Sequence, residues 1–316
     1  MSKIAVIIVS WNCRESLSRC LKSLKKYGPP GLEIIVVDNA SVDGTGQEIP
    51  LRFPDIHFLP QEKNLGFAAA NNIGVSDTKA DFLFFLNPDT FIKPRAIEIL
   101  QDFMEKTPKC ALAAPTLLDD KGNILHSIFK FPSLWNYWTE HSIFLPLRER
   151  LKKLFLRKDS PFTPDFKPCE IDWATGAAFL VRRNALEGES VFDERYFMYS
   201  EDADLCKRLA ERGWKRYLLP DAQVVHSHRQ SSIQARARTI FHLFHSMTIY
   251  YAKYKGPAGN FFLRLSIFTD MLLRIIILKI IPRKSASEEN RERLKGYKSV
   301  LSTLSPFRRD RGSGDV

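Results

Sequence analysis

"IAVIIVSWNCRESLSRCLKSLKKYGPPGLEIIVVDNAS", residues 4–41, contains the pattern that decides the fold. Residues 4–11 are apolar and rich in β-branched side chains, as in a strand that is buried on both faces. Leucines at helical spacing follow, and residues 32–41 form a second apolar strand that ends on Asp38. A strand, a helix and a strand within about 35 residues predict a right-handed parallel crossover unit.

The same alternation continues along the chain. Residues 56–60 and 81–86 have the pattern of strands, and a helix is expected at 64–76 between them. The apolar residues 110–115 resume the sheet. Alternating strands and helices predict an α/β domain.

One helix start is suggested by a side-chain pair. Asn12 and Glu15 stand three residues apart, just before the first run of leucines. This spacing is that of a capping pair, in which each side chain bonds a free backbone N–H at the helix start. We expect Asn12 to cap this helix.

Length, composition and cysteine content limit the possible classes. With 316 residues and 44% hydrophobic content, the chain can form one large α/β domain and an appendage. Its five cysteines are scattered and form no C-x-x-C pair, which argues against a disulfide framework or a structural zinc site. The opening residues lack a secretory pattern, so we expect a reducing, cytoplasmic location.

The positive charge is concentrated in the second part of the chain. The net charge is +11, of which residues 1–128 contribute −1 and residues 129–316 contribute +12. No helix has a dense basic stripe and no nucleic-acid motif is present, so we expect no nucleic-acid partner. An anionic membrane surface or an anionic lipid-linked substrate fits the charge, and so does a basic surface with no particular partner.

Acidic residues stand where predicted elements end or begin. Pro88 cannot donate to a sheet ladder, so the strand at 81–86 must stop and present Asp89 at its carboxyl end, where ligands bind in open α/β sheets. Asp38 could accept hydrogen bonds from a ribose or a base. The sequence has neither a dinucleotide fingerprint nor a P-loop, so a nucleotide would be held in another way.

These acids suggest a metal site and a base. Asp89 suits Mg²⁺ or Mn²⁺, and oxygens of a diphosphate and of water would complete the coordination shell of the ion. His226, or else His228, could add an imidazole ligand, which favours Mn²⁺. Asp202 is expected to open a helix whose N-terminal amides favour its ionised form, so that it could take a proton from a hydroxyl. Glu201 either tunes Asp202 or binds acceptor hydroxyls. Any single acid at such a position is more often a turn or cap residue, so the prediction depends on their combination.

Taken together, these residues resemble the family 2 glycosyltransferases, in particular their bacterial rhamnosyltransferase-like branch. The resemblance covers roughly residues 3–255. It is carried by seven blocks in the family's order: "VIIVSWN" (6–12), "VVDNASVDGT" (36–45), "NLGFAAANNIG" (64–74), "LNPDT" (86–90), "WATGAAFLVRR" (173–183), "FDERYFMYSEDADLCKRL" (192–209) and "VVHSHRQSS" (224–232).

The resemblance implies a GT-A fold, with a Rossmann-like mixed sheet flanked by helices, and inverting transfer from a nucleotide diphosphate sugar. It implies that "NPD" is the family's Asp-x-Asp motif with Asn87 in place of the first acid, that Asp89 and His226 hold the cation, and that Asp202 is the general base. The remaining residues would contact the nucleoside (Ser10, Asn12, Asp38, Ser41), the base or ribose (Asn64, Gly66) and the donor sugar or ribose (Asn87), or form the floor under donor sugar and acceptor (Trp173, Thr175, Gly176).

The branch suggests dTDP-L-rhamnose as donor and a lipid-linked or cell-surface polysaccharide acceptor. UDP-hexoses, UDP-galactofuranose or GDP-mannose could use the same residues. The chain lacks the Q-x-x-R-W element and the multiple spans of processive synthases, so transfer of a single sugar is expected. Because Asn87 replaces an acid, a scaffold that binds nucleotide sugars without catalysis is the alternative.

The expected domains are a catalytic domain (1–232), a helical extension (233–304) and a disordered tail (305–316). Within the first, residues 1–115 would bind the nucleotide, 128–168 would form an insertion or lid, and 169–232 would bind the acceptor. Residues 261–282 are interrupted by charges, so an interfacial helix at the inner face of the membrane fits better than a span. Packing on the same chain or in an oligomer is an equal alternative.

Overall fold

The computed structural model describes residues 2–140, 167–227, 236–280 and 288–304. The chain forms two compact units, the first made of residues 1–131 and 161–231 and the second of residues 132–160 and 232–316. We refer to them as unit 1 and unit 2. His228, most of the predicted insertion and the tail at 305–316 lie outside the described residues.

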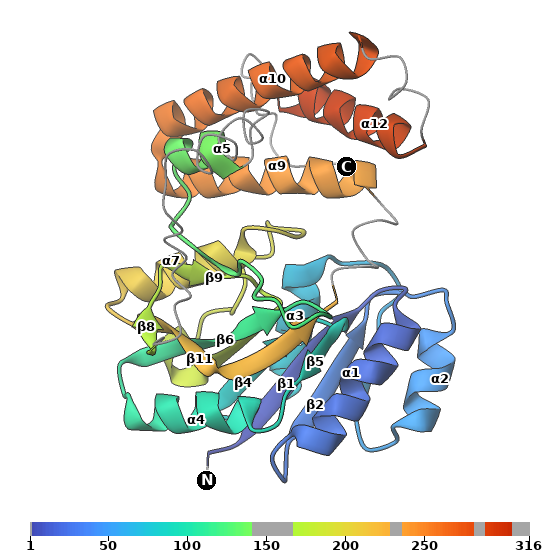
Figure 1. Ribbon diagram of the computed structural model, residues 1–316, viewed down its shortest axis with the longest axis vertical. Helices are drawn as coiled ribbons and strands as arrows, with labels where there is room; N and C mark the ends of the chain where they lie inside the picture. Colours follow the sequence, from blue (N-terminus) through green and yellow to red (C-terminus); the bar gives the residue numbers. More distant parts are fainter. Residues whose placement is uncertain (1, 141–166, 228–235, 281–287, 305–316) are drawn as a thin grey trace. The chain divides into compact units, whose positions relative to one another are not determined.

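Unit 1 alternates strands and helices, as the sequence predicts (Figure 1). Its first half contains β1 (Ile4–Ser10), α1 (Arg14–Tyr27), β2 (Glu33–Asp38), α2 (Thr45–Arg52), β3 (His57–Pro60), α3 (Phe67–Ser76), β4 (Phe82–Leu86), β5 (Thr90–Ile92), α4 (Ala96–Lys106) and β6 (Cys110–Leu118). Its second half contains β7 (Ile128–Phe129), β8 (Cys169–Glu170), β9 (Trp173–Ala174), β10 (Ala178–Arg182), η1 (Arg183–Leu186), α7 (Glu201–Glu211) and β11 (Lys215–His226).

Most of these strands form one mixed sheet. Along the described residues the strand order is β3-β2-β1-β4-β10-β6-β11-β5, and β8 also pairs with β11. The first four strands are parallel, and β10 is antiparallel to both of its neighbours. The carboxyl ends of β1, β2 and β4 therefore lie at one edge, where the sequence analysis places the site.

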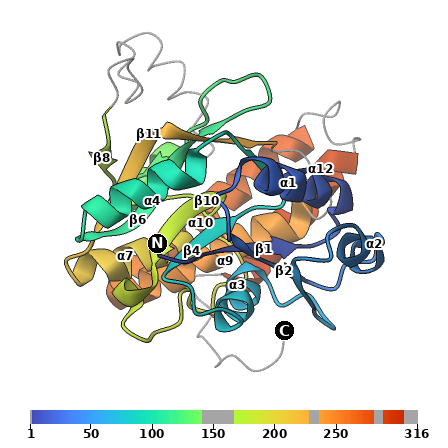
Figure 2. The ribbon, with the colours of Figure 1, turned by 90° about the horizontal axis from the view of Figure 1, so that it is seen from below.

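Helices cover both faces of this sheet, because successive side chains of a strand point to opposite faces. In β1, Ile4, Val6 and Ile8 pack with the apolar faces of α1, α2 and α4, whereas Ala5 and Ile7 point to the opposite face, which α3 and α7 cover. Figure 2 shows α1, α2 and α4 on one side of the strands and α3 and α7 on the other. Burial on both faces explains the uninterrupted apolar runs of the strands.

The expected cap at Asn12 is wrong. Cys13 occupies the N-cap position of α1, with no side-chain cap bond, and Asn12 has a left-handed φ of 50°. The N–H of Arg14 donates instead to the carboxylate of Asp43, at 2.9 Å. A residue from the loop after β2 therefore serves the helix start, which the local spacing could not reveal.

Unit 2 is helical in its described residues, with α5 (Leu134–Glu140), α9 (Arg236–Tyr254), α10 (Gly256–Ile280) and α12 (Glu288–Thr303). The long helices α9, α10 and α12 pack on one another (Figure 1). Gly296 of α12 lets that helix approach α9 closely, since a Cβ there would lie 3.1 Å from the carbonyl oxygen of Ala237. Asp270 of α10 is buried and accepts a 2.8 Å hydrogen bond from Nε of Arg274, one turn later.

Of the described helices, none has both the length and the apolar composition needed to cross a bilayer.

Candidate active site

The loops after β1 and β2 are tied together at the carboxyl ends of these strands. The carboxylate of Asp38 is buried and accepts hydrogen bonds from the Ser41 N–H at 3.1 Å and the Ser41 hydroxyl at 2.6 Å. The Ser41 Oγ accepts the N–H of Asn12 at 2.8 Å, and Ser10 is buried opposite Asp38 in the strand register. Burial raises the pKa of Asp38, while the bonds from Ser41 oppose that rise. The structure thus brings together Ser10, Asn12, Asp38 and Ser41.

A second cluster joins this loop to the start of α3. The buried Asn39 side chain donates to the carbonyl of Gly66 at 3.0 Å and accepts the N–H of Leu65 at 3.1 Å. The Asn64 Oδ1 accepts the N–H of Gly66 at 2.9 Å. Asn64 and Gly66 therefore lie beside the Asp38 loop, where Asn39 holds them.

Gly66 is the position where a side chain is least tolerable. Its φ is 85° and its ψ is 178°, and a Cβ there would lie 2.3 Å from the carbonyl oxygen of Phe197. We expect Gly66→Ala to lower the free energy of unfolding by about 2–4 kcal/mol, measured by urea denaturation. Gly122→Ala is the control, since Gly122 has a φ of 83° but no atom within 4 Å of its Cβ position. Equal losses in the two variants would contradict the close approach.

The turn after β4 follows the prediction from Pro88. The strand ends at Leu86, and the Thr90 hydroxyl closes the turn by donating to the carbonyl of Asn87 at 2.6 Å. The N–H of Asn87 donates to the carbonyl of Ala177 at 2.9 Å, which fixes the turn against the segment before β10. The structure therefore places Asn87 next to the predicted floor of the site.

Asp89 and His226 form a pair at the ends of neighbouring strands. Residues 90 and 226 face each other where β5 and β11 pair. The Asp89 Oδ1 lies 3.1 Å from the His226 Nε2, and the side chains are 10% and 9% exposed. A cavity of about 190 Å³ borders Asp89. The two side chains predicted to bind the metal are thus brought together.

This pair fits part of the coordination shell of a divalent cation. Adjacent ligand atoms of an octahedral Mg²⁺ or Mn²⁺ lie about 3 Å apart, close to the observed O–N separation. The described residues contain no group of three or more His, Cys, Asp and Glu side chains suited to a metal. The remaining positions would therefore need oxygens from a ligand and from water, which is how Mg²⁺ sites at phosphates are usually built.

Asp202 is held rigidly at the start of α7. Its Oδ2 accepts the N–H of Gly176 at 3.0 Å and its Oδ1 accepts the N–H of Ala203 at 2.8 Å. Tyr199 and Ser200 precede the helix with left-handed φ values of 70° and 65°. Such backbone costs of the order of 1–3 kcal/mol per residue and persists where the surroundings enforce it, often at functional sites.

The pKa values of the neighbouring acids Glu201 and Asp202 are both raised. Burial raises the pKa of Asp202 to about 6, although the N–H groups of Gly176 and Ala203 lower it. The pKa of Glu201 is raised well above its usual range, mainly by burial and to a smaller extent by the negative charge of Asp202. The Glu201 Oε2 is buried and has no hydrogen-bond partner among the described residues. The backbone amides favour the ionised form of Asp202, as the sequence predicts, but burial has the larger effect on its pKa.

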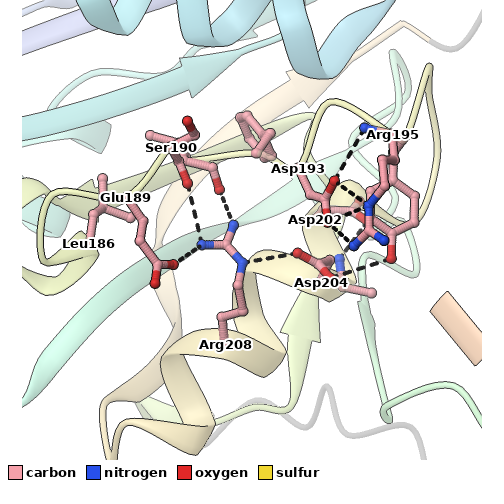
Figure 3. Close-up of polar contacts among 12 residues, drawn as sticks. Leu186, Glu189, Ser190, Asp193, Arg195, Asp202, Asp204 and Arg208 are labelled. Atoms are coloured by element: carbon pink, nitrogen blue, oxygen red, sulfur yellow. Dashed lines mark hydrogen bonds and ion pairs between the residues drawn. The ribbon is translucent and has the colours of Figure 1, made fainter. Parts of the chain in front are cut away.

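The body of α7 is anchored by a buried ion pair. The Arg208 Nε donates to the Asp204 Oδ2 at 3.0 Å, and its Nη1 reaches Glu189 at 3.4 Å and the carbonyl of Ser190 at 3.3 Å (Figure 3). The Asp204 side chain is fully buried. These contacts fix α7 to the loop after η1 and so fix the position of Asp202.

Trp173 lies on the small second sheet. There it pairs with Phe129, and the two rings stack with centroids 4.6 Å apart. Its indole N–H donates to the carbonyl of Lys130 at 2.9 Å. The N–H of Thr175 donates to the carbonyl of Ser127 at 2.9 Å. The next residue, Gly176, donates its N–H to Asp202.

Two asparagines that hold the site together were not among the predicted site residues. Asn39 links the loops after β2 and β3, as described above. The Asn72 side chain of α3 donates to the carbonyl of Phe192 at 2.8 Å and accepts its N–H at 3.0 Å, which fixes the loop that leads to α7. Both belong to the quoted sequence blocks, but sequence alone does not separate an asparagine that binds the chain from one that binds a ligand.

The sequence model of "Glycosyl transferase family 2" matches residues 5–187, more than half of the chain. The chain belongs to this family. It is therefore a glycosyltransferase, and the resemblance inferred from the sequence blocks is confirmed.

Several curated relatives share this family character. The N-acetylglucosaminyl-diphospho-decaprenol L-rhamnosyltransferase of Mycobacterium tuberculosis is 30% identical over 240 residues, which are 72% of this chain and 77% of the relative. Rhamnosyltransferase WbbL of Escherichia coli K12 is 29% identical over 170 residues, or 51% and 60% of the two chains. The glycosyltransferase is thus rhamnosyltransferase-like.

Solved structures show the fold. The mannosyltransferase PcManGT from Pyrobaculum calidifontis, solved with GDP-Man and Mn²⁺, superposes with a TM-score of 0.53 at 14% identity and covers 95% of this chain and 85% of that one. GalNAc-T7 with UDP, GalNAc and Mn²⁺ gives a TM-score of 0.54 at 18% identity over 73% of this chain and 44% of that one. The predicted GT-A fold is confirmed.

Proposed function

We propose that this glycosyltransferase moves one sugar, with inversion, from a nucleotide diphosphate donor to a hydroxyl of a lipid-linked or cell-surface glycan. The observation that carries the proposal is the placement of Asp202. Burial raises the pKa of its carboxylate to about 6, and this carboxylate accepts the N–H of Gly176. The carbonyl of the next residue, Ala177, accepts the N–H of Asn87 in the turn after β4. Such a carboxylate suits a general base, and the turn at Asn87 follows β4, the neighbour of β1 in the sheet.

In the proposed reaction, Asp202 takes the proton from the acceptor hydroxyl. A base works best when its pKa lies near the working pH, which burial provides here. The acceptor oxygen forms a bond to the anomeric carbon on the face opposite the diphosphate. The bond from that carbon to the diphosphate oxygen breaks, and its electron pair leaves with the diphosphate. Glu201, whose pKa burial also raises, would bind a hydroxyl of the acceptor.

The remaining residues would bind the donor. Asp38, with Ser10, Asn12 and Ser41, would contact the nucleoside, and Asn64 and Gly66 would lie near the base or ribose. Asn87 would touch the donor sugar or ribose, with Trp173, Thr175 and Gly176 as the floor below. Asp89 and His226 would hold Mn²⁺ or Mg²⁺, which when bound neutralises the charge of the diphosphate.

The proposed donor is dTDP-L-rhamnose, since two relatives are named rhamnosyltransferases. UDP-hexoses, UDP-galactofuranose and GDP-mannose are the alternatives. The name of the M. tuberculosis relative supports a lipid-diphosphate sugar as acceptor. All five cysteines are free, which agrees with the proposed place at the cytoplasmic face of the inner membrane.

The donor can be tested by thermal shifts with dTDP-, UDP-, GDP- and CMP-sugars, each with Mn²⁺ and with EDTA. We expect dTDP-L-rhamnose with Mn²⁺ to raise the melting temperature most, because a ligand stabilises the state that it binds. A larger rise with another nucleotide sugar would overturn the choice of donor. A rise of equal size in EDTA would overturn the role of the cation.

A further inference from the structure

One helix of unit 2 presents an unusual amount of apolar surface. Of the twelve large hydrophobic side chains that are exposed among the described residues, seven lie on α10. They are Phe261, Phe262, Leu265, Leu272, Ile276, Ile277 and Ile280. Scattered exposed apolar residues need no explanation, but a concentration on one helix marks an interaction surface.

These side chains form a continuous stripe rather than a ring around the helix. At 100° per residue, positions 261, 265, 272, 276 and 280 fall within about 100° of one another and extend over about 28 Å. Leu263, Ile267 and Met271 lie on another side and are fully buried. The helix therefore has one apolar face packed within unit 2 and a second that is exposed. We call this second face, defined by the seven residues above, the α10 stripe.

Charge complementarity identifies the occupant. Unit 2 contains 22 Lys and Arg and 9 Asp and Glu, a net charge of +13, so it accounts for all of the excess positive charge of the chain. The one acidic residue of α10, Asp270, is buried and paired with Arg274. Lys279 is exposed beside the stripe. An apolar stripe on a unit with a large net positive charge matches a helix that lies in the headgroup region of an anionic bilayer.

We infer that the α10 stripe docks unit 2 on an anionic phospholipid membrane, with the helix lying in the plane of the interface. The absence of any described helix able to cross a bilayer agrees with a surface position. The inference rests on the proposed function in one respect: docking would serve sugar transfer because an acceptor with a lipid anchor is held at such a surface. It can be tested without any sugar transfer.

The test is co-sedimentation of the full chain with vesicles of phosphatidylcholine and phosphatidylglycerol, and with vesicles of phosphatidylcholine alone. The variant is Leu272→Ser with Ile276→Ser, two stripe residues that are each 43% exposed. The matched control is Leu51→Ser with Ile124→Ser, two exposed apolar residues of unit 1. We expect the stripe variant to weaken binding to the anionic vesicles at least about 10-fold, and the control to leave it unchanged.

Added salt should weaken binding of the wild-type chain, and vesicles without the anionic lipid should bind it less. An unchanged melting temperature of the stripe variant shows that it folds, as expected for exposed residues. Equal sedimentation of wild type and stripe variant would overturn the inference. A second result would also overturn it: light scattering shows that the wild type is a dimer and the stripe variant a monomer, while both bind vesicles equally. The stripe would then join two copies of the chain.

Failure of this inference is distinguishable from failure of the proposed function. Vesicle binding needs neither donor nor acceptor, whereas transfer can be followed with a short-chain, water-soluble acceptor. We expect the stripe variant to retain transfer to such an acceptor at the wild-type rate. Loss of that activity in the folded variant would show that the stripe serves catalysis and would contradict a docking role.

Discussion

Replacing Asp202 with Asn is expected to lower the rate of sugar transfer by about 10²–10⁴-fold, the usual contribution of a general base. An amide keeps the shape of the side chain but has no basic oxygen to accept the acceptor's proton. The loss should appear in kcat, measured as sugar transferred from the donor, while donor affinity changes little. Glu211→Gln is the control, because it makes the same chemical change at the exposed end of the same helix.

The stability of this variant should have a characteristic pH dependence. The folded-state pKa of Asp202 is raised from 3.8 to about 6, so its contribution to stability is full below pH 3.8 and is lost as the pH rises through about 6. An Asn side chain does not ionise and avoids this loss. Between pH 4 and pH 7 the stability of Asp202→Asn should therefore rise relative to that of the wild type by about 1–3 kcal/mol in urea denaturation, whereas the loss of one acceptor for the N–H of Gly176 or Ala203 lowers it equally at both pH values.

These two measurements separate catalysis from folding. A folded variant that shows this rise and is inactive has lost a step of the reaction rather than its structure. If transfer persists at more than about a tenth of the wild-type rate, Asp202 is not the base. If the difference in stability between the variant and the wild type is instead the same at every pH, the pKa of Asp202 is not raised.

Replacing Asp89 with Asn is expected to have the second largest effect, a loss of at least about 10²-fold in the apparent affinity for Mn²⁺. The carboxylate would supply the one negatively charged ligand in the pair with His226. The measurement is the Mn²⁺ concentration that gives half-maximal transfer. His226→Ala should shift it in the same direction, whereas Asp55→Asn, on an exposed residue of unit 1, should not.

Either of two outcomes would contradict this role of Asp89. Transfer that needs the same Mn²⁺ concentration in both proteins would show that the cation binds elsewhere. Transfer that is complete in EDTA would show that no cation takes part, and the Asp89–His226 contact would then be a structural ion pair. Thermal melting of the variants without metal serves as the check on folding.

The sequence predicted β1, β2, β4 and β6, because these strands are buried on both faces and so are apolar without interruption. It also placed Asp38 and Asp89 correctly at strand ends, since Pro88 and the polar residues after Asp38 interrupt the ladder for local reasons. Their convergence at one edge followed from the parallel crossover rule. These features depend on residues that are neighbours in the chain.

The features that the sequence missed depend on contacts between distant segments. Asn12 does not cap α1 because its side chain accepts the N–H of Val42, from another loop, while Asp43 of that loop serves the helix start. The pKa of Asp202 rises because the surrounding chain buries it, which no local helix rule includes. Asn39 and Asn72 hold loops that the sequence gives no reason to join.

The most direct test of the account is the anomeric configuration of the product, read by NMR after the purified chain has converted the donor found in the thermal-shift panel. We expect a configuration opposite to that of the donor sugar, and almost no product from Asp202→Asn. Retention of the donor's configuration would contradict direct attack by an acceptor oxygen that Asp202 activates. A chain that binds the donor with Mn²⁺ but never turns it over with any glycan acceptor would point to a binding scaffold instead.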